Sequence, residues 1–315
     1  MTPLRDRPHR TIRIIGFLGY GLILYALGFL FQAEYFDQGF FVSLVLTPLC
    51  LGAMAQTVFD PARQQNHWWI VLYALGLTAV MLAILWLIEV ETLICIVVSL
   101  PIIIPLEMVG VILARSYLGQ NNTTMNAALF LLPLLALPAE RYVTYPQSAG
   151  VVISKIIIDA PTDAVWGHTV VIPPIQEHER IWTLSHMLLG APQPVSAEVE
   201  GNLRQLKWTK GVRFQEIITE RIKHERLAWN FSFNDPQSLA SFDPHISPNS
   251  EMLRVANGFY QLSATADGRT LVQLQTHYTV RSPFNAYLNL WGHLFLNDFQ
   301  NSVLAVIKSR SEGAI

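Results

Sequence analysis

VVISKIIIDAPTDAVW (residues 151–166) combines a strand-like segment with the start of a helix. Residues 151–159 are dominated by Val and Ile, which favour strands. Pro161 follows, and Asp163 then lies in the first turn of the next segment, where an acidic side chain favours the positive end of a helix. The stretch therefore predicts a strand that leads into a short helix, at the beginning of a water-soluble domain.

Downstream, turn signals separate short strand-like segments, and a long helix-like segment comes last. QEHERIWTLSHMLL (176–189) carries apolar residues at helical spacing and predicts a second helix. Lys210-Gly211 and Asp267-Gly268 mark hairpin turns between strands. Residues 284–310 predict a long amphipathic helix. The remaining strand-like segments are VSAEVEG, LRQLKWT, VRFQEIITER and RLAWNFSF, which with the later hairpin predict about six antiparallel strands.

Upstream, the chain is strongly apolar. Only 14% of all residues are charged, against roughly 25% in a typical soluble domain, and the deficit lies before residue 139. Four runs are long enough to cross a hydrocarbon core of roughly 30 Å, namely Ile14–Phe31, Phe41–Phe59, Trp68–Ile88 and Leu93–Ala114. Thr124–Pro138 is shorter and is either a fifth crossing or a re-entrant segment. We therefore predict a transmembrane domain over 1–138, a linker over 139–150 and a soluble domain over 151–312.

Positive charge in the short loops predicts the orientation in the membrane. Four arginines precede the first apolar run, Arg63 follows the second and Arg115 follows the fourth, whereas the loops at 32–40 and 89–92 carry only acids. This pattern places the N-terminus in the cytoplasm of a bacterial inner-membrane protein. Five crossings place the C-terminal domain in the periplasm, which we favour, and four place it in the cytoplasm. The halves before and after residue 139 each carry nearly balanced charge, so no nucleic-acid partner is expected.

The order of the soluble elements predicts an α+β helix-grip fold, in which a curved antiparallel sheet wraps a long C-terminal helix around an apolar cavity. IIIDAPTDAVW (156–166) resembles the opening of the helix-grip (SRPBCC) superfamily, which includes START lipid-transfer domains, Bet v 1-like proteins and polyketide cyclases. GFYQLSATADGRTLVQLQTHYTV (258–280) fits the same pattern. The whole layout resembles uncharacterised bacterial membrane proteins that carry such a domain after several spans. The resemblance implies a fold and a cavity, but no single reaction.

Aromatic residues of the soluble half are the candidate ligand-binding residues. His277 and Tyr278 alternate on one strand, so one of them faces the cavity. On the last helix, Trp291 lies on the apolar stripe, where it either lines the cavity or packs in the core. The full set of candidates is Trp182, Trp208, Trp229, Tyr278, Tyr287, Trp291 and Phe295.

Weaker candidates carry acid–base chemistry. The long insertion SFDPHISPNSEMLRVANGFY (241–260) contains Asp243 and His245, which form either an acid–base pair or a hydrogen bond that orders the loop. His277 is the third catalytic candidate. Glu107 lies inside the fourth apolar run, where an ionisable group is a functional suspect. The alternative is that Pro101 and Pro105 break the helix, so that Glu107 caps the freed amides or lies near the inner interface. No His or Cys spacing of a metal site occurs, so neither a metal nor a cofactor is expected.

Three functions fit these patterns. The first is a membrane-anchored domain that binds, transfers or senses a hydrophobic small molecule such as a lipid, quinone or isoprenoid. The second is a polyketide-cyclase-like enzyme that uses the His and Asp candidates. The third is a sensory or scaffolding membrane protein, for which the sequence names no protein partner. The first requires the lipid bilayer and a hydrophobic ligand as its partners.

Overall fold

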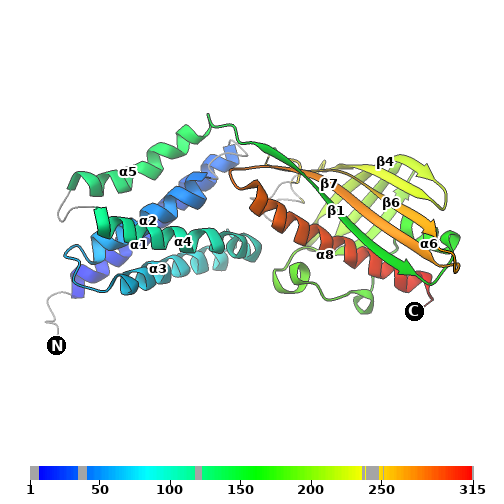
Figure 1. Cartoon of the computed structure of the whole chain (residues 1–315), viewed down its shortest axis with the longest axis horizontal. Coiled ribbons are helices and arrows are strands. Elements are labelled where there is room, and N and C mark those ends of the chain that lie inside the picture. Colours follow the sequence, from blue (N-terminus) through cyan, green and yellow to red (C-terminus); the bar gives the residue numbers. More distant parts are fainter. Residues whose placement is uncertain are drawn as a thin grey trace. The chain divides into compact units, whose positions relative to one another are not determined.

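The chain forms two compact units, Met1–Thr144 and Tyr145–Ile315. Figure 1 shows the computed structural model, which describes residues 7–34, 41–117, 123–235, 238, 248–250 and 252–313. The first unit is helical, and the second combines one antiparallel sheet with helices. The candidates Asp243 and His245 lie outside the described residues.

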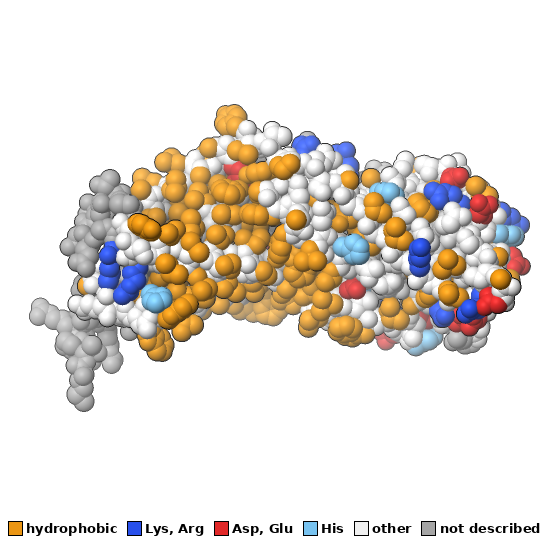
Figure 2. All heavy atoms as spheres, viewed as in Figure 1, with side chains coloured by type: hydrophobic (Ala, Val, Ile, Leu, Met, Phe, Trp, Pro, Cys, Tyr) orange, Lys and Arg blue, Asp and Glu red, His pale blue; other side chains and the backbone are white. Residues whose placement is uncertain are grey.

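The N-terminal unit contains the helices that the apolar runs predict. They are α1 (Arg7–Glu34), a π-helical turn η2 (Val42–Leu46) that continues into α2 (Thr47–Phe59), α3 (His67–Leu87), α4 (Leu93–Tyr117) and α5 (Thr123–Glu140). Within the described residues, four stretches are long and apolar enough to cross a membrane: Thr11–Gly28, Val42–Phe59, His67–Leu87 and Leu93–Tyr117. Hydrophobic side chains cover most of the face of this unit seen in Figure 2, as expected of helices that face lipid.

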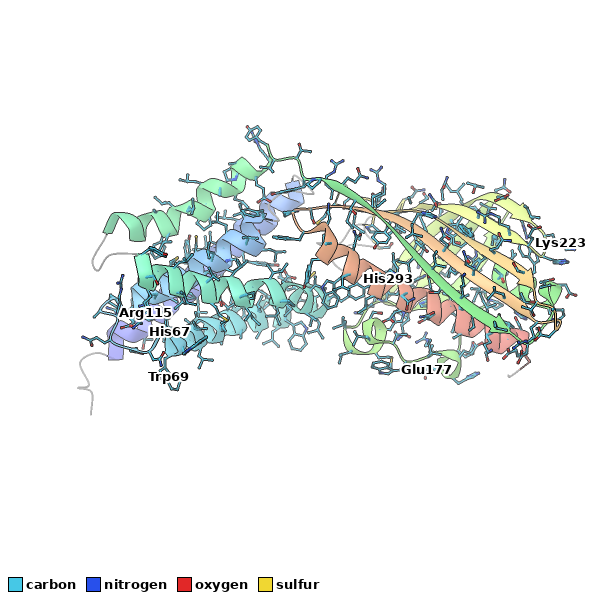
Figure 3. All side chains as sticks on the ribbon, in the orientation of Figure 1. His67, Trp69, Arg115, Glu177, Lys223 and His293 are labelled. Carbon is cyan, nitrogen blue, oxygen red and sulfur yellow. The ribbon has the colours of Figure 1, made fainter. Side chains whose placement is uncertain are left out.

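Polar contacts fasten the two ends of this helical unit. At one end, Asp60 accepts hydrogen bonds from the backbone after α2 and pairs with Arg115 of α4 at 3.4 Å. Figure 3 shows Arg115 and His67 at this end. At the start of η2, the buried Glu140 accepts from the backbone N–H groups of Phe41 and Val42 at 2.6 and 2.8 Å. η2 and α2 form one continuous run from Val42 to Asp60. The last residue of α5, Glu140, therefore lies at the Val42 end of this run, and Arg115 lies at the Asp60 end.

The C-terminal unit is built on a seven-stranded antiparallel sheet with the order β1-β7-β6-β5-β4-β3-β2. Its strands are β1 (Gln147–Ile158), β2 (Pro194–Glu200), β3 (Leu203–Trp208), β4 (Arg213–Ile222), β5 (Arg226–Ser232), β6 (Leu253–Ala264) and β7 (Thr270–Arg281). The short helix α6 (Thr162–Val170) follows β1, and the long helix α8 (Asn285–Ser311) ends the unit. This arrangement is consistent with the predicted helix-grip fold. Strand β1 begins before residue 151, so the irregular connection after α5 is shorter than the predicted linker 139–150.

A ladder of amide side chains fastens α8 to the edge strand β1. Asn289 donates to Ser148 Oγ at 3.1 Å, Asn297 donates to Ser154 Oγ at 3.0 Å, and Gln300 donates to the carbonyl of Val152 at 3.2 Å. C-terminal to this ladder, α8 packs on the sheet in one hydrophobic core, with Leu304 and Ile307 fully buried among residues of β5, β6, β7 and α6. The ladder and the core together fix the helix across the sheet.

Two glycines make room for the ring of Tyr278 on β7. A Cβ atom at Gly150 of β1 would lie 2.2 Å from Tyr278 Cζ, and one at Gly292 of α8 would lie 3.2 Å from the same ring. No side chain larger than hydrogen fits at Gly150 without displacing the ring. Tyr278 is therefore held between strand β1 and helix α8, and its hydroxyl donates to the carbonyl of Asn289 at 3.3 Å.

The predicted helix over 176–189 is wrong. The segment contains only a 3-10 turn, η3 (Glu177–Glu179), and a π-helical turn, η4 (Leu184–Leu188). Arg180 and Thr183 between them have extended backbones, with ψ angles of 132° and 154°, because Glu179 is committed to an ion pair with Arg310 and Thr183 caps the second turn. The two turns are thus fixed by side-chain contacts of Glu179 and Thr183, and they do not form one continuous apolar face.

Candidate functional site

A cluster of partly buried aromatic rings lies between the sheet and α8. Strand β3 supplies Trp208, β4 supplies Phe214, and β5 and the residue after it supply Phe231 and Phe233, all joined by ring contacts of 5.4 to 6.1 Å. Phe299 of α8 meets Trp208 edge-on at 5.0 Å. We call these five rings the aromatic cluster. None of them is fully buried, so the sheet and helix leave apolar ring surface accessible here.

A second row of rings runs along α8 from the aromatic cluster toward its N-terminal end. Tyr287, Trp291, Phe295 and Phe299 are spaced four residues apart, so successive rings turn by about 40° around the helix. Trp291 stacks on Phe295 at 5.9 Å and meets Tyr287 at 6.4 Å. We call Tyr287, Trp291 and Phe295 the aromatic strip. The described side chains from Asn285 to Phe299 include none that is fully buried, whereas burial begins at Gln300.

His186 of η4 forms one wall beside the aromatic cluster. Its imidazole stacks on Phe299 at 5.1 Å, and burial lowers its pKa, so the ring is neutral at pH 7. Nδ1 lies 3.4 Å from the carbonyl of Ala191. Because a carbonyl only accepts, Nδ1 carries the proton and Nε2 is a buried acceptor, without a partner among the described residues.

The enclosed space next to His186 is small. Ile175, Pro194, Ser302 and Val306 contribute to its lining, and its volume is about 10 Å³, which is room for about one water molecule. This hollow is too small for a lipid-sized molecule.

A buried ion pair closes the interior on the side of α6. Arg204 of β3 donates to Glu216 of β4 at 2.7 Å and to the carbonyls of Thr169 and Val170 at 3.0 and 3.1 Å. Its guanidinium also lies 5.8 Å from the ring centre of Tyr260 on β6. Burial raises the pKa of Tyr260 to about 12, so this hydroxyl keeps its proton. Each of the three guanidinium nitrogens donates to a protein acceptor, so we assign this network to structure rather than to ligand binding.

Trp229 of β5 lies between this network and the aromatic cluster. It is 3% exposed, and a Cβ at Gly258 of the next strand would come within 3.0 Å of its ring. Its indole N–H has no partner in the part of the chain that the structure describes. Trp229 thus packs in the core and also offers one donor toward the interior.

The seven aromatic candidates do not form one site. Tyr287, Trp291, Phe295 and Trp208 line the partly open side of the interior, and Trp229 and Tyr278 are core residues. Trp182 is apart from them, with 69% of its surface exposed.

The acid–base candidate His277 is not brought to the interior. Tyr278 faces inward on β7, so the neighbouring His277 lies on the outer face of the sheet, where its Nε2 is 2.8 Å from Gln275. Arg204, Glu216 and His186 contribute to the interior but were not singled out from the sequence, and neither were the four phenylalanines of the aromatic cluster. The first two had a signal, because a charge alternates with apolar residues in LRQLKW and RFQEII and so falls on the inward face.

Glu107 of α4 is fully buried inside the N-terminal unit. Thr78 of α3 donates to its Oε1 at 2.5 Å, whereas Oε2 has no partner among the described residues. A Cβ at Gly52 of α2 would lie 2.1 Å from the Glu107 carbonyl, and Gly110 of α4 approaches α2 as closely. Prolines at 101 and 105 do not break α4, which continues to Tyr117. Glu107 is therefore part of a close helix crossing, as small residues permit in membranes, rather than a cap on a broken helix.

No family model matches the chain, and no curated protein matches it. Among solved structures it is similar to an uncharacterised protein from Bacillus thuringiensis, with 14% identity, a TM-score of 0.33 and coverage of 51% of this chain and 98% of that one. It is similar to a protein from Thermus thermophilus, with 16% identity, a TM-score of 0.32 and coverage of 52% and 98%. It is also similar to truncated norcoclaurine synthase from Thalictrum flavum, with 12% identity, a TM-score of 0.33 and coverage of 53% and 94%.

Proposed function

We propose that this protein is a membrane-anchored binding protein for a hydrophobic ligand, such as a lipid, quinone or isoprenoid. The ligand lies between the aromatic strip on α8 and the aromatic cluster on β3, β4 and β5. The observation that carries the proposal is the partial exposure of eight rings. Four lie on α8 between Tyr287 and Phe299, and four lie on or just after β3, β4 and β5, whereas the C-terminal half of α8 is packed in the core. A folded domain gains by covering such ring surface, and a long apolar molecule covers it.

The polar atoms beside these rings specify the head of the ligand. Nε2 of His186 accepts, and the indole N–H groups of Trp229 and Trp291 donate, with no described protein group satisfying any of them. A buried polar atom without a partner costs free energy, so a ligand that pairs with it is favoured over a plain hydrocarbon. We therefore expect a ligand with an apolar body and a hydroxyl or carbonyl head.

The helical unit provides a source for such a ligand. Four apolar stretches long enough to cross a membrane precede the binding unit in the same chain. A lipid-soluble molecule partitions into the bilayer, where its local concentration is high. Anchoring the binding unit there shortens the path from the leaflet to the aromatic strip.

Native mass spectrometry of the full chain tests the proposal. We expect the purified protein to carry a hydrophobic ligand, and Trp291→Ala to lower its occupancy about tenfold or more, because burying an aromatic side chain is worth about 1.5–3 kcal/mol and 1.4 kcal/mol is tenfold in affinity. Leu290→Ala is the matched control, since Leu290 is the next residue on α8 and is 65% exposed. Equal loss in both variants, or no ligand from several expression hosts, would contradict the proposal.

A further inference from the structure

The segment Arg180–Leu189, which we call the η4 loop, exposes apolar side chains to solvent. Ile181, Trp182, Met187 and Leu188 are 40%, 69%, 59% and 60% exposed. They form two pairs on either side of the segment Thr183–His186, in which Thr183, Ser185 and His186 are buried. An exposed set of this size on a short segment marks an interaction site more often than it marks ordinary surface.

The η4 loop is firmly held although its apolar side chains point outward. Asp298 of α8 accepts from both the backbone N–H and the hydroxyl of Ser185, at 2.9 and 2.6 Å. His186 stacks on Phe299 of the same helix, and the carbonyl of Ser185 accepts from Ala191 at 2.7 Å. Because its buried residues are fixed, the loop cannot rotate its outer side chains into the core, and their exposure is built into the fold.

We propose that the η4 loop docks on the lipid bilayer and inserts Ile181, Trp182, Met187 and Leu188 into the interfacial layer. Trp combined with aliphatic residues is the composition that prefers this layer. Arg180 is exposed at the start of the loop, and the exposed Lys210 donates a hydrogen bond at 2.6 Å to the carbonyl of Gly190, the residue that follows the loop. These cations complement anionic headgroups, and Glu177, three residues before the loop, is an exposed acid (Figure 3).

The rest of the chain favours the bilayer over a soluble partner. The connection between Glu140 of α5 and Gln147 of β1 is residues 141–146, which reach at most about 20 Å when extended. A unit tethered so closely to apolar helices meets the bilayer at a very high effective concentration. This inference goes beyond ligand binding, because the aromatic cluster and strip could be occupied whether or not the loop touches lipid.

Site-directed spin labelling of the full chain in lipid vesicles tests the proposal. Cys50 and Cys95 are replaced by Ala, and single cysteines are introduced as Trp182→Cys, Leu188→Cys and Lys223→Cys, the last at the exposed turn between β4 and β5 (Figure 3). Vesicles contain phosphatidylcholine with or without phosphatidylglycerol. Collision rates with oxygen, which concentrates in lipid, and with a water-soluble nickel complex report the depth of each label.

We expect the oxygen-to-nickel collision ratio at 182 and 188 to exceed that at 223 several-fold, and to rise further with phosphatidylglycerol at low salt. Ratios at 182 and 188 that equal the ratio at 223 in both lipid mixtures would overturn the proposal. Dipolar coupling between labels at 182, together with water-like ratios, would assign the loop to a contact between two copies and would also overturn it. Unchanged ligand occupancy in native mass spectra separates either result from a failure of the proposed function.

Discussion

Removing Arg204 should destabilise the sheet far more than removing a neighbouring lysine. Arg204→Met deletes hydrogen bonds of 2.7, 3.0 and 3.1 Å and leaves the carboxylate of Glu216, which is 3% exposed, without its cation. Breaking a buried ion pair on one side typically costs about 3–5 kcal/mol. Lys207→Met is the matched control on the same strand, because the pair of Lys207 with Glu198 has both side chains more than half exposed and such pairs contribute about 0–1 kcal/mol.

Hydrogen exchange of the full chain in detergent micelles measures this difference locally. Where opening is in rapid equilibrium, the exchange rate of a protected amide follows the free energy of opening. At about 1.4 kcal/mol per power of ten, Arg204→Met should speed exchange in β4 and β5 by roughly two to more than three powers of ten. The double variant Arg204→Met/Glu216→Met should recover most of this loss, because no unpaired charge remains buried. A Lys207→Met effect as large as that of Arg204→Met, or a double variant as unstable as the single one, would refute the reasoning.

Three further predictions concern other parts of the chain. The Arg310 guanidinium lowers the pKa of Glu179 to about 2, below roughly 4.3 in the unfolded chain. The pair therefore stabilises the fold by about 3 kcal/mol above pH ~4.5, and this contribution is lost as the pH falls toward 2. Glu179→Gln should therefore flatten the decline of the denaturation midpoint over that range, and an unchanged decline would argue against the pair. Gly150→Ala should lower the free energy of unfolding, measured by thermal denaturation, by about 1–3 kcal/mol because its Cβ meets the ring of Tyr278. The double variant Gly150→Ala/Tyr278→Leu should recover part of this stability, and the absence of any recovery would argue against the clash. Alkaline phosphatase fused after Ile315 should be active, as expected for a periplasmic C-terminal domain, because α5 ends at the opposite end of the α2 run from the arginine-bearing loop. An inactive phosphatase together with a fluorescent cytoplasmic reporter would show that the domain faces the cytoplasm.

The sheet and its long helix were predictable from the sequence because burial on one face imposes a regular pattern. Strand β7 alternates without exception between inward and outward residues, and α8 lies within one residue of its predicted bounds. The segment 176–189 has apolar residues at helical spacing, but its polar side chains make contacts that a continuous helix would not allow. Its carboxylate at Glu179 and its hydroxyls at Thr183 and Ser185 are bound to side chains or backbone far from helical positions, and spacing alone does not report such bonds.

The candidate site was predictable in part for a similar reason. The spacing of Tyr287, Trp291 and Phe295 on one helix is visible in the sequence, so the aromatic strip could be predicted. The aromatic cluster joins residues of three strands and a helix, and its members meet only through the strand order, which a single sequence does not reveal. Arg204 was overlooked because a charged residue in a strand is ordinarily assigned to the solvent face, although its alternation with Leu206 and Trp208 indicated the opposite.

The amide ladder between α8 and β1 also constrains how the chain is made. Strand β1 pairs only with β7, across more than a hundred residues of sequence, and its other support is the helix that follows β7. During synthesis β1 therefore leaves the ribosome before its partners. It stays unpaired until α8 has also been synthesised, and its apolar residues include Val151, Ile153 and Ile157. Such long-range closure makes folding slow, so the strand that follows the helical unit in the sequence is the last to be secured. Until then it is the strand most exposed to chaperones and proteases.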